Sequence, residues 1–213
     1  MENKKYLDDL SEIKQMMSRS SRFISLNGLA GVFAGIYAII GAVIAKILLS
    51  RHGSLYDHDY NTVRIETTDP DLLVNLLVIA LSVLILAIAT AILFTTRKAK
   101  KHNQKIWDNT SRRLIINFFA PLAAGGLFCV VLLQYQLIGL IAPSMLIFYG
   151  LALIHASKYT FNDLKSLGYT NLILGLIATQ FIGYGLYFWA AGFGLFHILY
   201  GIWMYNRYER KAE

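Results

Sequence analysis

Residues 72–95 read LLVNLLVIALSVLILAIATAILFT, a run without a charged side chain. A helix needs about 20 apolar residues to cross the roughly 30 Å hydrocarbon core of a bilayer, and this run is long enough. A helix is required there, because backbone N–H and C=O groups in lipid must be paired within the segment. The run therefore predicts an α-helical membrane protein.

Five more apolar runs accompany it along the 213 residues. The chain is 56% apolar, above the roughly 45–50% that is usual for soluble proteins. With tight turns expected near residues 134–136 and 188–193, the pattern predicts an all-α membrane protein built as a six-transmembrane-helix bundle. We expect its spans at about residues 23–49, 72–95, 114–133, 137–156, 169–189 and 190–206.

The first 22 residues differ from the rest because they are polar and charged. Apolar side chains recur within them every three to four residues, which predicts an amphipathic helix over residues 5–19 on the inner membrane surface. They show no cleavable signal pattern, so we expect span one to act as an uncleaved anchor. The expected parts are a cytoplasmic amphipathic segment at 1–22, a transmembrane domain at 23–206 and a cytoplasmic tail at 207–213.

Positive charge lies mostly on alternate connections between the spans. Of the 20 Lys and Arg, five precede span one, seven lie between spans two and three, two lie between spans four and five, and three follow span six. Loops rich in Lys and Arg stay in the cytoplasm, so we expect both termini inside and the loop at 51–71 outside. The net charge of +7 then reflects topology. Nucleic acid is not an expected partner, because the longest basic run is short and lacks interleaved aromatic residues.

Small residues distinguish the odd-numbered spans. They let helix backbones approach closely in lipid, where packing drives helix association. Span one carries them at four-residue spacing, including Gly31 and Gly35, and spans three and five are similar. We therefore expect spans one, three and five at the centre of the bundle. Span two is almost entirely Leu, Ile, Val and Ala, and we expect it to face lipid.

Asn27, Asn117 and Asn171 form a weak internal repeat. Each lies near the cytoplasmic end of an odd-numbered span and is followed by Gly or Pro at the fourth residue and Ala at the seventh. The repeat predicts three tandem helical hairpins, with the amides facing one another or a shared polar site. The alternative is chance, since such matches arise easily in segments rich in Gly and Ala.

No Asp or Glu lies within a span, which argues against a proton-driven pump. His197 lies in span six, where it is either a buried ring bonded to a Tyr or Asn, or a ligand-binding or proton-sensing group. Tyr184 and Tyr200 belong to an aromatic set in the last two spans. That set forms an interface belt or lines a pocket for an apolar ligand.

Metal and cofactor sites are not expected. The single cysteine, Cys129, excludes an internal disulfide and a cysteine metal cluster. His52 and His58 lie with Asp57 and Asp59 in the external loop, at a spacing that matches no closed metal motif. The sequence also lacks a Gly-x-Ser-x-Gly, a His-Glu-x-x-His and a phosphate loop, so no catalytic residue is assigned.

Four stretches carry a resemblance to a known family: Ser20–Ala42, Tyr149–Thr160, Gly183–Gly185 and His197–Gly201. On these the chain resembles an uncharacterised family of small six-helix bacterial inner-membrane proteins. The resemblance implies a multi-pass protein of the bacterial inner membrane. It implies no activity.

The expected function is that of a non-enzymatic integral membrane protein that binds an apolar or lipid-like ligand, or a partner, within the bundle. The partner would be another membrane protein or a second copy of the chain. The alternatives are a small secondary transporter or channel and, least favoured, an intramembrane enzyme. The candidate ligand-binding residues are Asn27, Asn117, Asn171, Tyr184, His197 and Tyr200.

Overall fold

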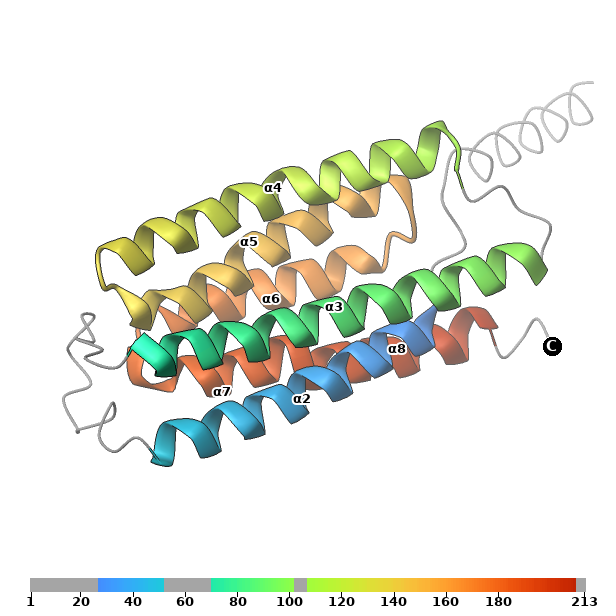
Figure 1. The fold of residues 1–213 in the computed structure, drawn as a ribbon. Coiled ribbons are helices and arrows are strands. Elements are labelled where there is room, and N and C mark those ends of the chain that lie inside the picture. Colours follow the sequence, from blue (N-terminus) through green and yellow to red (C-terminus); the bar gives the residue numbers. More distant parts are fainter. Residues whose placement is uncertain (1–26, 52–69, 102–106, 210–213) are drawn as a thin grey trace, which may run out of the picture.

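The computed structural model describes residues 27–51, 70–101 and 107–209, and these form an all-α bundle of six helices (Figure 1). The expected amphipathic helix at 5–19 and the loop at 52–69 lie outside the described residues. The first five helices are α2 (Gly28–Arg51), α3 (Pro70–Lys101), α4 (Asn109–Gln134), α5 (Ile141–Ala156) and α6 (Leu164–Ala178).

The sixth is a continuous helix over residues 182–209, here called the C-terminal helix. Its helix type changes along its length between 3₁₀, α and π. In order, it comprises η3 (Ile182–Tyr184), α7 (Gly185–Trp189), the π-helical η4 (Ala190–Leu195), α8 (Phe196–Met204) and the π-helical η5 (Tyr205–Glu209). The short 3₁₀ elements η1 (Ile138–Leu140) and η2 (Ser157–Tyr159) flank α5.

Five of the six helices are long and apolar enough to cross a membrane, and α6 is apolar but shorter. This confirms the predicted fold class. The turn expected near 134–136 is also present, because α4 ends at Gln134 and η1 begins at Ile138.

The predicted turn at 188–193 is wrong. Those residues lie inside the C-terminal helix, and the chain reverses over residues 179–181 between α6 and η3. Thr179 and Gln180 mark the true turn: the Thr179 hydroxyl donates to the Leu176 carbonyl at 2.7 Å, which satisfies a helix-end acceptor. The glycine-rich stretch after it looked like a turn because glycine serves both turns and close helix contacts.

The helices pack as two groups of three that meet along the C-terminal helix (Figure 1). In one group α5 lies between α4 and α6. In the other, α2 lies between α3 and the C-terminal helix. Near its α7 part, the C-terminal helix also contacts α5 and α6, which joins the groups.

The closest helix contacts are made by glycine. A Cβ added to Gly35 of α2 would lie 2.6 Å from the Gly194 carbonyl oxygen, and one on Gly28 would lie 2.5 Å from that of Gly201. The α5–α6 contact is similar, since a Cβ on Gly150 would lie 2.7 Å from the Gly168 carbonyl oxygen. These backbones touch because no side chain separates them, as expected for helices associating in lipid.

The prediction that spans one, three and five share the centre is wrong for span three, because α4 lies on the outside of its group. In contrast, α2 lies between α3 and the C-terminal helix, and α6 lies between α5 and the C-terminal helix. Gly125 of α4 packs against Phe148, but a Cβ on Gly126 would meet nothing within 4 Å. Ala120, Ala123 and Ala124 of α4 are exposed. A stripe of small residues therefore permits a close helix contact, but it does not specify whether another helix packs against it.

The third predicted hairpin would pair α6 with the C-terminal helix. It is not observed, because α6 packs mainly against α5, the helix before it.

The placement of span two agrees with the structure. The most apolar 18-residue stretch of α3 has no buried residue. It contacts α2 on one side through pairs such as Phe33 and Phe94, whose ring centroids lie 5.6 Å apart.

The two ends of the bundle differ in charge. The end with Lys46 and Arg51 has only these two Lys or Arg among the described residues. The opposite end holds the C-terminus of α3, the N-terminus of α4 and the last turn of the C-terminal helix (Figure 1). At that end lie Arg97, Lys98, Lys100, Lys101, Arg112, Arg113, Lys158, Lys165 and Arg207.

Candidate functional site

A buried polar cluster lies where α5 and α6 meet the C-terminal helix. Its centre is His197, which is 7% exposed. His197 Nδ1 lies 2.8 Å from the Gly192 carbonyl oxygen, and His197 Nε2 lies 2.7 Å from the Tyr149 hydroxyl. Both ring nitrogens therefore have partners from within the bundle.

The partners assign the proton positions on the ring. A carbonyl oxygen only accepts, so Nδ1 carries the proton and donates to Gly192. In the neutral imidazole Nε2 is then an acceptor, and the Tyr149 hydroxyl donates to it. Two hydrogen bonds in series therefore connect the Tyr149 hydroxyl of α5, the His197 ring and the Gly192 carbonyl of the C-terminal helix.

The π-helical segment η4 makes this geometry available. Its backbone bonds span five residues, as in the bond from the Phe196 N–H to the Ala191 carbonyl. The same five-residue offset places the His197 ring beside the Gly192 carbonyl. Short π-helical insertions occur frequently at functional positions.

Asn171 of α6 lies against the same glycine and is completely buried. Its Nδ2 donates to the Leu167 carbonyl at 3.0 Å. Its Oδ1 is the one fully buried side-chain nitrogen or oxygen atom of the described residues without a hydrogen-bond partner. A Cβ on Gly192 would lie 2.8 Å from this oxygen, so glycine is required for Asn171 and the C-terminal helix to pack together.

Aromatic rings enclose the polar cluster. The Tyr149 ring centroid lies 4.9 Å from that of Phe193 and 6.1 Å from that of Phe118. Trp189 continues the stack, at 5.3 Å from Phe193. At such separations the rings form aromatic pairs that pack beside the buried cluster.

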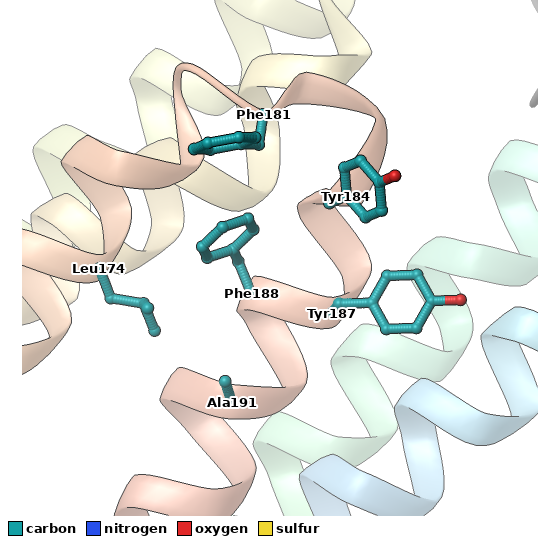
Figure 2. Close-up of a pocket in the computed structure, with 6 residues that line it drawn as sticks. All are labelled: Leu174, Phe181, Tyr184, Tyr187, Phe188 and Ala191. Carbon is teal, nitrogen blue, oxygen red and sulfur yellow. The ribbon is translucent and has the colours of Figure 1, made fainter. Parts of the chain in front are cut away.

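An open groove of about 460 Å³ lies beside the cluster, between α6 and the first part of the C-terminal helix (Figure 2). Phe181 and Phe188 face each other across it, with ring centroids 6.1 Å apart. The hydroxyls of Tyr184 and Tyr187 point away from Leu174 (Figure 2). The lining is aromatic or aliphatic throughout: Leu174, Phe181, Tyr184, Tyr187, Phe188 and Ala191.

The groove and the polar cluster share a wall. Ala191 precedes Gly192, and Leu174 lies one helical turn after Asn171. The Leu174 side chain also reaches to within 3.3 Å of where a Gly192 Cβ would lie. An apolar ligand in the groove would therefore press on the residues that hold His197 and Asn171.

The structure brings together only some of the residues singled out from sequence. Asn171 and His197 both contact Gly192, and Tyr184 lines the groove. Tyr200 lies nearer the basic end, where it packs against a small core of α5 and α6 residues. Whether any of them binds a ligand stays a prediction.

The three asparagines do not form a shared site. Asn27 Oδ1 accepts from the Leu29 N–H at 2.8 Å, which caps the start of α2. Asn117 Nδ2 donates to the Arg113 carbonyl at 2.8 Å within α4. Each amide thus bonds to its own helix, and α2, α4 and α6 are not neighbours.

Sequence reasoning missed Tyr149 and Gly192, which complete the polar cluster, and Phe181, which lines the groove. Phe188 belonged to the aromatic set of the last two spans but was not singled out as a candidate residue. An isolated tyrosine in an apolar span carries no signal of its partner. The phenylalanines had a weak signal in the aromatic density after residue 180.

No group of three or more His, Cys, Asp or Glu that could hold a metal ion occurs in the described ranges. Comparisons with protein-family models, curated proteins and solved structures find no match to this chain. The function is therefore argued from the geometry of the cluster and the groove.

Proposed function

We propose that this protein is a non-enzymatic membrane protein that binds an apolar, lipid-like ligand in the groove between α6 and the C-terminal helix. The groove carries the proposal. Its volume of about 460 Å³ falls in the range of small-molecule sites, about 300–1,000 Å³, which are lined mainly by apolar and aromatic side chains. It is open rather than enclosed, so a ligand can enter it without the helices separating.

Binding is tested with purified, delipidated protein in mild detergent and a phospholipid that carries a fluorophore on its acyl chain. We expect saturable binding. Leu174→Trp fills the groove and should weaken binding by about tenfold or more, a loss of ~1.4 kcal/mol.

The matched control is Ile173→Trp, because Ile173 is the neighbouring residue on α6, is 55% exposed and does not line the groove. It should leave binding unchanged. Non-saturable binding, or equal effects of the two variants, would refute the proposal. A second copy or another membrane protein copurifying in place of lipid would favour the partner alternative.

The transporter or channel alternative has one observation in its favour. The buried cluster of His197, Tyr149 and Asn171 adjoins a π-helical segment within an apolar helix, and polar groups at membrane depth are often functional. Solute flux in proteoliposomes above that of empty liposomes, abolished by His197→Phe, would support transport over binding.

We also propose a bacterial inner-membrane location, six membrane crossings and cytoplasmic termini. The location rests on the resemblance proposed from the four sequence stretches alone, and the charge difference between the two ends of the bundle supports the orientation. Reporter fusions after Arg97, Lys165 and Glu213 should read cytoplasmic, and one within residues 54–67 should read external. A cytoplasmic reading from that loop would overturn the topology.

A further inference from the structure

Lys46 of α2 lies beside the groove. Its Nζ is 5.0 Å from the centroid of the Tyr187 ring, and Tyr187 lines the groove. The Tyr187 ring projects from the C-terminal helix toward the group that contains α2 (Figure 2). A cation therefore lies at one edge of an otherwise apolar site.

The charge of Lys46 is not neutralised by the described part of the protein. No described carboxylate forms an ion pair with Lys46, whereas Arg207 pairs with Asp163 at the opposite end of the bundle. Lys46 is exposed, and its ammonium keeps N–H donors available while it lies over the ring. Its methylene stem can lie along apolar surface while the charge stays at the membrane interface.

The position is also unusual for a cation. Lys46 and Arg51 are the only described Lys or Arg residues at this end of the bundle. Positive charge is generally sparse on an external face. A lysine beside an aromatic groove complements a ligand that joins an anionic head group to an apolar chain.

We infer that the groove binds an anionic glycerophospholipid, with its phosphate on Lys46 and an acyl chain along Phe181, Phe188 and Leu174. The inference rests on the proposed function and adds the chemical class of the ligand. The head group is assigned to a membrane lipid because the groove is open and lined by residues of two apolar helices, and Lys46 lies near the end of a membrane-length helix.

The test compares two lipids with identical acyl chains, dioleoyl phosphatidylglycerol and dioleoyl phosphatidylcholine, each titrated into delipidated protein and followed by native mass spectrometry. The wild type should bind the anionic lipid about fivefold more tightly, the effect of one interfacial cation. The preference should fall as ionic strength rises.

Lys46→Met should abolish the preference, because it lowers the affinity for phosphatidylglycerol more than that for phosphatidylcholine, whose choline offsets the charge of the same phosphate. Lys46→Arg should retain the preference. Arg51→Met is the matched control, since five residues along α2 place Arg51 about 140° around the helix from Lys46. It should keep the preference.

Equal affinity of the wild type for the two lipids, or a preference that survives Lys46→Met, would overturn the inference and leave the proposed function intact. Failure of both lipids to bind saturably would overturn both. Loss of binding of both lipids in Lys46→Met, with an unchanged melting temperature, would also contradict a role confined to the head group.

Discussion

The helix α3 and the C-terminal helix are both apolar and membrane-length, yet only the C-terminal helix has buried residues in its most apolar stretch. The most apolar stretch of α3 has no buried residue, and its large side chains Leu81, Ile85 and Ile92 are more than half exposed. The sequence of the C-terminal helix includes glycines, tyrosines and a histidine among its apolar residues, and this helix joins the two groups of helices.

The difference shows what places a helix inside a membrane bundle. Apolar side chains gain little by leaving lipid for a protein interior of similar polarity, so they do not draw α3 inward. Glycines admit a neighbouring backbone and polar groups find partners only within protein. The C-terminal helix has both, through Gly194, Gly201 and His197.

The largest expected effect tests the glycine contact. Gly35→Leu should destabilise the protein by about 1–3 kcal/mol, because its Cβ would lie 2.6 Å from the Gly194 carbonyl oxygen and the Ile198 side chain. Denaturation in SDS, followed by circular dichroism, measures the loss. Gly126→Leu is the control, since a Cβ there meets nothing within 4 Å. Equal losses would show that glycine contact does not distinguish the two positions.

The polar cluster should have the next largest effect. Tyr149→Phe removes the donor to His197 Nε2 and should cost about 1 kcal/mol, within the range of hydrogen bonds between membrane helices. The ¹⁵N chemical shifts of the His197 ring should change with it, which a purely packing role for Tyr149 would not produce. Tyr135→Phe, at an exposed turn position, should change neither readout.

A finer test compares two glycines one turn apart on α2. Gly35→Ala should still destabilise, whereas Gly31→Ala should be tolerated, because its Cβ would lie 3.5 Å from Gly201 Cα, an ordinary contact distance. Melting temperatures of the two variants in one detergent measure the difference. The contact geometry would be contradicted by a greater loss from Gly31→Ala.

The smallest effect is expected on α3. Leu84 is 48% exposed, and Leu84→Ala should change stability by no more than about 0.5 kcal/mol, as at other positions without specific contacts. SDS denaturation again measures it. A loss comparable to that of Gly35→Leu would mean that α3 has a packing partner beyond α2.

The fold was predictable from the sequence where charged connections alternate with apolar runs of membrane length, as around α3 and α4. The boundary between α6 and the C-terminal helix was not, because Gly183 and Gly185 are compatible with a turn as well as with a helix. Central placement failed for α4, whose alanines face outward.

The candidate site was predictable only in part. His197 and Asn171 stood out because polar side chains are rare in apolar spans. Their common partner is Gly192, whose contributions are a carbonyl oxygen and the absence of a side chain. Neither property can be read from a glycine in sequence, so the cluster became visible only in three dimensions.

The shortness of α6 has a consequence for the bilayer around it. Its 15 residues extend about 22 Å, less than the roughly 30 Å of a typical hydrocarbon core. In the proposed topology with six crossings, lipid beside this helix must thin locally or the protein must tilt, at a cost of fractions of a kcal/mol per Å. We expect membrane thickness to tune the protein, with greater thermal stability in bilayers of 14-carbon chains than in bilayers of 22-carbon chains.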